Sequence, residues 1–256
     1  MSYTPNELFS LRGRTALVTG SSRGIGAAIA QTYAAAGAHV VVHGHTAAST
    51  EKTVDLIESA GGSCTSIAGD LARPGEGRTL VEQSIAINGV LDILCINASA
   101  QINATLENLN DQDFSTQIDV NLRASIDMLQ SALPAMAANG WGRVVNIGSI
   151  NQDRPKAVVT AYAATKAALH NIVKSQAREY AKTGVLLNTL APGLIDTDRN
   201  AERKQRDPKA WLEYTQTVNW MGRAGASEDL VGAALLLASD ACCFMTGETI
   251  MATGGG

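Results

Sequence analysis

Short apolar segments alternate with longer amphipathic ones along the chain, and this alternation restricts the fold more than any other feature. The first six short segments are mostly continuously apolar, as expected of strands covered by helices on both faces. The predicted strands are residues 15–18, 39–42, 65–68, 91–96, 143–147, 185–190 and 249–252. The predicted helices are residues 24–36, 49–60, 75–88, 111–139, 159–183 and 227–239. Regular strand–helix alternation predicts an α/β fold with a doubly wound parallel sheet of about seven strands and right-handed crossovers.

Size and composition predict one globular domain over residues 1–256. The chain is 45% hydrophobic and 17% charged, and its net charge of −4 gives no support for a nucleic-acid or membrane partner. No apolar run approaches the ~18 residues of a membrane span. Residues 1–11 lack the basic and apolar regions of a secretory signal, so we expect a cytoplasmic protein.

Residues 194–222 interrupt the last crossover with a polar, charged and helix-prone sequence, and we predict that they form a mobile flap over a site. Metal binding is not expected. The spacing of the cysteines matches no zinc pattern, and His43 and His45 are too few for a metal site. Cys64, Cys95 and the adjacent pair Cys242 and Cys243 are predicted to be reduced packing residues.

A glycine-rich turn, Thr19-Gly20-Ser21-Ser22-Arg23-Gly24-Ile25-Gly26, joins the first predicted strand to the first predicted helix. Gly20 permits the tight turn, Gly24 lets a pyrophosphate approach the backbone, and Gly26 lets the helix pack against the strand. The amides and partial positive charge of a helix N-terminus then face the phosphates. This context predicts a bound dinucleotide.

The end of the second predicted strand indicates which dinucleotide is bound. An NAD enzyme places an acidic residue there to bind the ribose 2′-hydroxyl. This chain has Gly44 at that point, so no carboxylate repels a 2′-phosphate. Arg23 and a protonated His45 can bind such a phosphate. NADP(H) is therefore favoured, and NAD(H) stays possible.

Tyr162 and Lys166 lie one helical turn apart on the same face of a predicted helix. A lysine ammonium stabilises a phenolate and lowers a pKa that is otherwise ~10, which suits a proton shuttle at neutral pH. Ser149 follows the fifth predicted strand and can hydrogen-bond a reacting oxygen. These residues predict a catalytic site at the carboxyl edge of the sheet.

The spacing G-x-x-x-G-x-G, Ser149 and the Tyr162–Lys166 pair occur in an order that resembles the short-chain dehydrogenase/reductase family, over about Leu11 to Gly255. The resemblance implies a Rossmann-type single domain with helices on both faces and a catalytic tetrad of Asn121, Ser149, Tyr162 and Lys166. It implies that Asn121 holds a water connected to the lysine. The cofactor contacts predicted from the motifs and the resemblance are Gly20, Ser22, Arg23, Gly24, Ile25, Gly26, Gly44, His45, Asp70, Leu71, Asn97, Ala98, Tyr162, Lys166, Pro192, Gly193, Ile195 and Thr197.

Two departures from the family pattern concern the pocket and the C-terminus. Ser99 stands where the family usually has the glycine of Asn-Ala-Gly, which is expected to narrow the pocket. Residues 252–255 read Ala-Thr-Gly-Gly where the family often has Val-Asp-Gly-Gly, with an expected effect on subunit packing. The resemblance also implies a homotetramer, in which helices 111–139 and 159–183 pair across a two-fold axis.

The implied reaction is reversible hydride transfer between a nicotinamide and a carbonyl carbon. Polar residues 150–154 and a basic flap, with Arg199, Asn200, Arg203, Lys204 and Arg206, predict a small hydroxyl-rich or acidic substrate such as a keto sugar acid or polyol. Residues 8–13 also resemble gluconate 5-dehydrogenases. The predicted substrate contacts are Ser99, Asn151, Gln152 and Arg199.

Two alternatives stay open. One is 3-oxoacyl carrier-protein reduction, which Arg123 and Arg178 support, whereas Asp127 and the negative net charge weaken it. The other is a non-catalytic redox sensor that binds the dinucleotide and a protein partner. The intact tetrad argues against the sensor.

Overall fold

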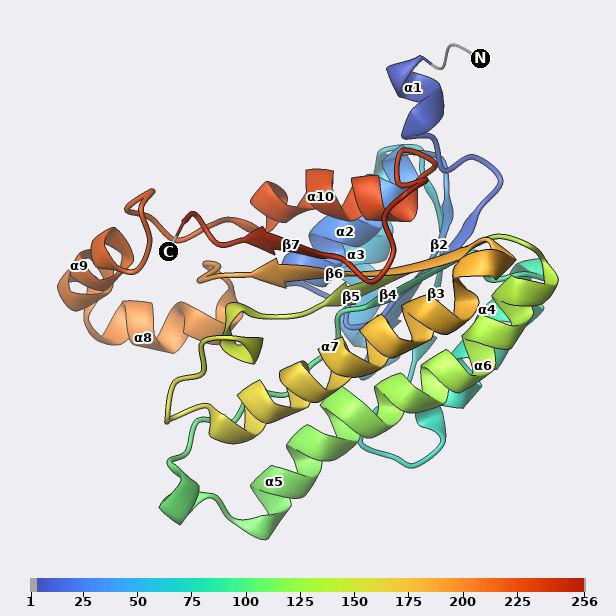
Figure 1. Ribbon diagram of the computed structural model, residues 1–256. Coiled ribbons are helices and arrows are strands. Elements are labelled where there is room, and N and C mark those ends of the chain that lie inside the picture. The colour runs from blue at the N-terminus through green and yellow to red at the C-terminus, as the bar shows by residue number, and fades with distance from the viewer. Residues whose placement is uncertain (1–3, 256) are drawn as a thin grey trace.

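The computed structural model describes residues 4–255, which form a seven-stranded parallel sheet between two layers of helices (Figure 1). The strand order is β3-β2-β1-β4-β5-β6-β7, so the direction of winding reverses between β1 and β4. This Rossmann-type arrangement confirms the predicted fold class. The strands are β1 (Thr15–Val18), β2 (His39–Gly44), β3 (Ser63–Ala68), β4 (Ile93–Ile96), β5 (Gly142–Ile147), β6 (Val185–Pro192) and β7 (Thr249–Ala252).

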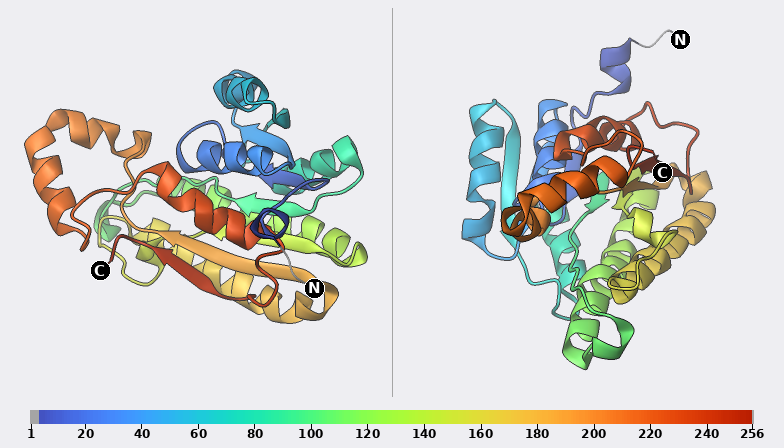
Figure 2. Two further views of the ribbon diagram at one scale, coloured as in Figure 1. Left: turned by 90° about the horizontal axis from the view of Figure 1, so that it is seen from above. Right: turned by 90° about the vertical axis from the view of Figure 1, so that its left-hand side faces the viewer.

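Helices cover both faces of the sheet. One face carries α2 (Gly24–Ala35), α3 (Ala47–Ser59) and α10 (Val231–Ala238), and the other carries α4 (Glu76–Asn88), α6 (Ala124–Ala138) and α7 (Thr160–Tyr180). The remaining helices are α1 (Pro5–Leu8) and α5 (Asp111–Ile118), which leads into α6. Within the flap, α8 (Ala201–Arg206) and α9 (Pro208–Thr217) project beyond the carboxyl ends of the strands, apart from both layers (Figure 2). Short 3₁₀ turns complete the chain at η1 (Leu106–Asn108), η3 (Ile150–Gln152), η4 (Ala181–Thr183), η5 (Asp198–Asn200) and η6 (Ser227–Leu230).

Three sequence expectations are corrected. The helix expected over residues 111–139 is interrupted by a π-helical turn, η2 (Asp119–Arg123), a feature that often marks functional sites. The helix expected over residues 227–239 begins as the 3₁₀ turn η6. β3 is partly exposed because it forms one edge of the sheet, whereas β1, β4 and β5 are buried along their whole length.

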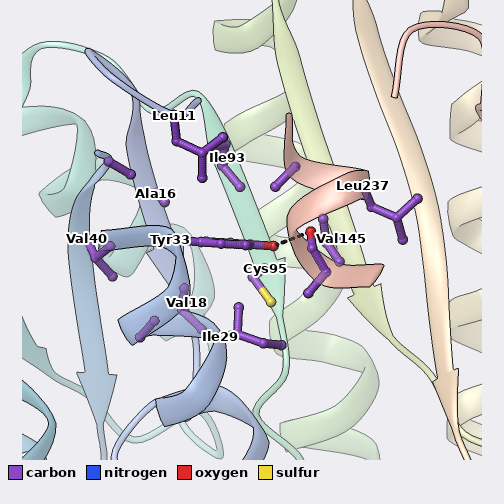
Figure 3. Close-up of a cluster of buried hydrophobic side chains, with 14 of the residues drawn as sticks. Leu11, Ala16, Val18, Ile29, Tyr33, Val40, Ile93, Cys95, Val145 and Leu237 are labelled. Carbon is purple, nitrogen blue, oxygen red and sulfur yellow. Dashed lines mark hydrogen bonds between the residues drawn. The ribbon is translucent and has the colours of Figure 1, made fainter. Parts of the chain in front are cut away.

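A hydrophobic core lies on each face of the sheet, and the one beneath α2 and α10 contains a single buried phenol. The ring of Tyr33 is fully buried between these helices and the sheet, and its hydroxyl donates a 3.0 Å hydrogen bond to the Ala234 carbonyl (Figure 3). Burial raises the pKa of Tyr33 well above its usual value, so the hydroxyl stays neutral. This bond therefore joins the first crossover helix to the last.

The cysteines are free thiols in the structure. Cys95 is fully buried in β4, and burial raises the pKa of its thiol to about 12, consistent with an unreactive packing residue. Cys242 is also buried, but Cys243 is exposed, so the expectation of packing does not hold for the second member of the pair. Cys243 follows α10 in the turn that leads toward β7, where its side chain is exposed to solvent.

Removing the Tyr33 hydroxyl should destabilise the fold without affecting the site. We expect Tyr33→Phe to lower the free energy of unfolding by about 1 kcal/mol, because the Ala234 carbonyl loses a buried donor. Urea denaturation measures this difference. Tyr180→Phe is the control, because no hydrogen bond of the Tyr180 hydroxyl is found within residues 4–255 and its side chain is only partly buried. Equal stability of the two variants would contradict the role given to the Tyr33 hydrogen bond.

Candidate active site

A cleft of about 1140 Å³ lies at the carboxyl ends of the strands. Its walls come from the glycine-rich turn, the ends of β2 to β6, the N-terminal part of α7 and the flap. The reversal of winding between β1 and β4 opens this edge of the sheet, which is where open α/β sheets bind their ligands. The position of the cleft thus follows from the strand order.

Most of the residues expected at the site line this one cleft. Two do not: Asn121 and Gln152. Those that do are Gly20, Ser22, Arg23, Gly24, Ile25, Gly26, Gly44, His45, Asp70, Leu71, Asn97, Ala98, Ser99, Ser149, Asn151, Tyr162, Lys166, Pro192, Gly193, Ile195, Thr197 and Arg199. The chain therefore brings the cofactor motif and the Tyr–Lys motif together at a single cleft.

The glycine-rich turn has the geometry of a phosphate cradle. Gly20 and Gly24 have φ angles of 62° and 56°, a conformation that side chains disfavour. A Cβ at Gly20 would lie 2.8 Å from Ala98 Cα, and one at Gly26 would collide with the Asn97 amide. No side chain caps the first turn of α2, because its N-cap is Arg23, so the amides there stay available to an anion. These residues fit a bound dinucleotide.

His43 anchors the glycine-rich turn, a role that the sequence did not indicate. Its Nδ1 accepts a 3.0 Å hydrogen bond from the Gly20 amide, and its Nε2 lies 3.2 Å from the Gly69 carbonyl. Both contacts require a neutral ring with its proton on Nε2. Burial lowers the pKa of His43, and the neighbouring His45 lowers it further. The one sequence feature that could have indicated this role is the position of His43 in a strand that follows the glycine-rich turn.

The adenosine end of the cleft carries mixed charge. His45 Nδ1 lies 3.7 Å from Asp70 Oδ1, and Arg73 lies 3.8 Å from the same carboxylate. The side chain of Arg23 is largely exposed and lies 3.7 Å from Asp198. Gly44 is tightly enclosed, since a Cβ there would collide with Ser49. Gly44 therefore presents no carboxylate to the cleft, and the side chain against it, Ser49, is polar.

The reaction centre is built on α7 and the end of β5. Tyr162 and Lys166 are only 5% and 3% exposed, and the Lys166 Nζ lies 5.8 Å from the centre of the Tyr162 ring. The ammonium donates a 2.7 Å hydrogen bond to the Ile147 carbonyl, which fixes it at the end of β5. Ser149 follows two residues later and lines the same cleft as Tyr162.

The electrostatics of the centre favour a phenolate. Burial alone raises the pKa of Tyr162, but the charges of Lys166 and Arg199 and the nearby Ser149 hydroxyl outweigh it, so the pKa is lowered. Burial lowers the pKa of Lys166, and Tyr162 opposes that shift. A buried phenol with a lowered pKa beside a buried ammonium is suited to proton transfer.

Asn121 and Gln152 support the site from outside the cleft. The Asn121 side chain exchanges two hydrogen bonds with the backbone of Ala100, at 2.7 and 2.8 Å, and donates a third to Thr165 Oγ1 at 3.0 Å. It thereby fastens the loop after β4 to α7, next to Lys166. Gln152, which was expected to contact the substrate, instead accepts a 3.3 Å hydrogen bond from the Ser149 amide and caps the turn η3.

Arg199 reaches from the flap across the cleft. Its guanidinium donates to the Ser99 hydroxyl at 3.0 Å and to Gln101 Oε1 at 3.1 Å. The guanidinium carbon lies 5.8 Å from the centre of the Tyr162 ring. A cation from the flap is therefore a direct neighbour of the reacting phenol.

A buried Tyr–Lys pair and a serine, set at the carboxyl edge of a Rossmann-type sheet beside a glycine-rich turn, define an oxidoreductase that uses a nicotinamide dinucleotide. The sequence model of the short chain dehydrogenase family matches residues 14–208. This chain belongs to that family.

Relatives named for several different activities match nearly the whole chain, among them a 3beta-hydroxysteroid dehydrogenase of Eggerthella lenta that is 34% identical over 254 residues, 96% of this chain and 94% of the relative. A gluconate 5-dehydrogenase of Gluconobacter oxydans is 34% identical over 252 residues, which cover 97% of this chain and 96% of the relative. A 3-oxoacyl-[acyl-carrier-protein] reductase of Rickettsia conorii is 33% identical over 248 residues, which cover 97% and 98% of the two chains.

Two of the similar solved structures carry the names gluconate 5-dehydrogenase and 3-oxoacyl (acyl-carrier-protein) reductase. A 3-oxoacyl (acyl-carrier-protein) reductase from Agrobacterium tumefaciens with NADP bound is 62% identical, with a TM-score of 0.98 and coverage of 100% of this chain and 99% of that one. A gluconate 5-dehydrogenase from Burkholderia cenocepacia in complex with NADP and tartrate is 31% identical, with a TM-score of 0.91 and 98% of both chains covered.

Tyr162→Phe should abolish turnover and leave dinucleotide binding intact. The variant keeps the buried ring but loses the proton that the reaction requires, so kcat should fall by about a hundredfold or more. Steady-state kinetics give kcat, and fluorescence titration gives the dinucleotide Kd. Tyr180→Phe, at the other end of α7, is the matched control. Turnover of the Tyr162 variant close to that of the wild type would refute the assignment.

Alcohol oxidation should gain rate as the pH rises and level off below the pKa of a free phenol. Oxidation needs Tyr162 as phenolate, and its pKa is lowered, so the active base is present from a lower pH upward. Arg199→Gln removes one of the charges that lower this pKa, so the profile should move to higher pH. The profile of kcat/KM for oxidation measures both effects. An unchanged profile in the variant would show that Arg199 does not act on the phenol.

Proposed function

We propose that this protein is an NADP(H)-dependent oxidoreductase that interconverts a carbonyl and a secondary alcohol on a small polar substrate, such as a keto sugar acid or a polyol. The observation that carries the proposal is the polar surrounding of Tyr162, made by Ser99, Asn151 and Arg199 at the cleft. The Oδ1 of Asn151 is buried and has no hydrogen-bond partner among residues 4–255, while its Nδ2 lies 3.3 Å from Ser149 Oγ. A substrate hydroxyl would satisfy that oxygen.

The residues of the site divide the work of carbonyl reduction. The bound dinucleotide supplies the hydride. Tyr162 donates its phenolic proton to the carbonyl oxygen, and Ser149 hydrogen-bonds that oxygen as negative charge develops on it. Lys166 stabilises the phenolate that remains. Asn121 keeps the loop after β4 and the start of α7 in register, and the family resemblance assigns it the water that returns a proton toward Lys166.

NADP(H) is supported as the dinucleotide by the charge at the adenosine end and by relatives whose structures contain NADP. Gly44 carries no carboxylate, and Arg23 and His45 lie at the cleft to pair with a 2′-phosphate. Around the rest of the dinucleotide, the glycine-rich turn would hold the pyrophosphate, Asp70 the adenine and Thr197 the nicotinamide amide.

Gly44→Asp should shift the preference from NADPH toward NADH, because a carboxylate repels the 2′-phosphate and accepts a ribose hydroxyl. We expect the ratio of kcat/KM for NADPH to that for NADH to fall by about tenfold or more. Any side chain at this position meets Ser49, so Gly44→Ala is the control for crowding. An equal change of the ratio in both variants would mean that charge does not decide the cofactor, and a wild type that prefers NADH would refute the choice.

Reduction of 3-oxoacyl carrier protein is the second candidate, favoured by the name of the Agrobacterium relative. The surface for an acidic carrier is weakened here. Arg123 is paired with Asp119 at 2.7 Å, and Asp127 lies one turn further along α6. Arg178 is exposed on α7 and keeps this candidate open. A redox sensor is disfavoured because the complete Tyr–Lys–Ser centre is assembled.

A substrate panel decides between these candidates. 5-Ketogluconate, related keto acids, simple polyols, aromatic ketones and acyl thioesters are assayed side by side with both dinucleotides. We expect the highest kcat/KM among the keto acids and polyols. An apolar substrate would leave the polar groups beside Ser149 unpaired, at a cost of ~1–3 kcal/mol each. Turnover confined to aromatic ketones and thioesters would overturn the proposal, and no turnover of any compound would favour the sensor.

We further propose a homotetramer in the cytoplasm, with residues 194–222 acting as a mobile flap within a single domain of residues 1–256. The tetramer rests on the family resemblance and on the neighbouring α5–α6 and α7, which would pair with a second copy. Within residues 4–255, no helix is long and apolar enough to cross a membrane. Light scattering measures the assembly directly, and a monomer at micromolar concentration would contradict it.

A further inference from the structure

The flap end of the cleft is lined by basic side chains that have no carboxylate partner. They are Arg154, Lys156, Arg199, Arg203 and Arg206. None of the five forms an ion pair within 4.0 Å with any acidic group of residues 4–255. By contrast, Lys204 pairs with Asp196 at 2.6 Å and Lys209 with Glu213 at 4.0 Å, and neither lysine lines the cleft. The unpaired cations of the flap region are thus those that face the cleft.

Two of these cations meet at one aromatic ring. Lys156 Nζ donates a 2.7 Å hydrogen bond to Tyr214 Oη, and the guanidinium carbon of Arg203 lies 3.9 Å from the centre of the Tyr214 ring. Trp211 is buried beside them, 5.6 Å from the same guanidinium carbon. We call Lys156, Arg203 and Tyr214 the Tyr214 cluster. It joins the loop after Ser149 to α8 and α9.

The Tyr214 cluster concentrates positive charge. Burial raises the pKa of Tyr214, but the hydrogen bond and charge of Lys156, together with Arg203, outweigh it and lower the pKa. Two cations held at one ring repel each other unless an anion lies between them. The cleft-lining acids of the flap do not supply it, since Asp198 is paired with Arg23 and Glu202 forms no ion pair with either cation. An anion from outside the chain would complete the cluster.

We propose that the Tyr214 cluster is a second anion-binding subsite, which holds a carboxylate or phosphate at the end of the substrate remote from the carbon that reacts at Tyr162. The assignment rests on the proposed function for the size and class of the substrate. Arg199 contacts the part of the substrate next to the reacting carbon, because it lies over the Tyr162 ring and is held by Ser99 and Gln101. The substrate class is therefore a small hydroxyketone with a terminal anionic group.

The test compares substrates that differ in the terminal group. The probes are 5-ketogluconate, fructose 6-phosphate and fructose, assayed with NADPH against Lys156→Met and Arg203→Met. Each variant should lose about ten- to hundredfold in kcat/KM for the anionic probe that fits, mainly through KM, because a charge-assisted hydrogen bond is lost. The neutral fructose should change by less than about threefold. Lys209→Met removes a positive charge from the same flap, but outside the cleft. This control should leave kcat/KM unchanged for the anionic probes and for fructose.

Each outcome separates the subsite from a purely structural contact. Loss on the carboxylate alone or on the phosphate alone identifies which anion the cluster binds. Equal loss on all three probes would show that Lys156 and Arg203 only hold the flap closed, and would overturn the proposal. Lys156 and Arg203 are exposed, so both variants should fold, which thermal melting verifies. Tyr214→Phe keeps the ring beneath Arg203 but removes the acceptor of Lys156, and should give an intermediate loss on the same probe.

Failure of the proposed function would be recognised separately. If none of the three probes is reduced, the proposed substrate class is wrong, and the subsite is tested by binding instead. Calorimetry then measures the Kd of gluconate and of inorganic phosphate for the enzyme saturated with NADP+. Weaker binding in Lys156→Met and Arg203→Met, but not in Lys209→Met, would support an anion subsite without a matching reaction. Absence of binding, or equal binding in all four proteins, would overturn the subsite itself.

Discussion

The rest of the site depends on one buried ammonium. Lys166 is almost inaccessible to water, and burying an unpaired charge is costly unless hydrogen bonds and an opposite charge compensate it. The Ile147 carbonyl supplies one bond, and Tyr162 supplies the opposite charge when its phenol is ionised. The cost of burying Lys166 is thus linked to the ionisation of Tyr162, so the lysine and the tyrosine act as one unit. Because Ile147 ends β5 and Lys166 lies on α7, the unit forms only when that crossover is correctly packed.

The cofactor end meets this unit through backbone geometry. The direction of winding reverses between β1 and β4, which leaves an opening at the carboxyl edge of the sheet. The glycine-rich turn lines part of this opening. The glycines of the turn have no side chains that could fix their positions. His43 and Asn97 hold it from the neighbouring strands, through the Gly20 amide and the Gly20 carbonyl. The precision of the phosphate cradle therefore comes from β2 and β4 as much as from the turn.

Sequence patterns that repeat with secondary structure were sufficient for the fold and for much of the site. The sheet, the glycine-rich turn and the Tyr162–Lys166 pair all follow from local spacing. What local spacing could not give are contacts between distant segments, such as the His43 bond to Gly20 and the meeting of Lys156 with Tyr214. The π-helical turn at Asn121 was also hidden, and so were the hydrogen bonds that Asn121 makes with the loop after β4 and with α7, which are distant in sequence. Gln152 was predicted to contact the substrate. The sequence does not show the direction of its side chain, which instead accepts a hydrogen bond from the Ser149 amide.

The two parts of the cleft differ in how firmly they are built, and this difference has a functional meaning. The reaction centre consists of buried groups on β5 and α7, whereas the flap is held over it by exposed polar contacts, Arg199 with Ser99 and Lys156 with Tyr214. Exposed contacts of this kind contribute only about 0–1 kcal/mol each. Weak contacts of this kind fit the mobile flap proposed for residues 194–222, and a substrate anion that joins the cationic side chains would add to the same contacts. Selectivity and closure would then arise from one set of charges, while the chemistry beneath stays common to the family.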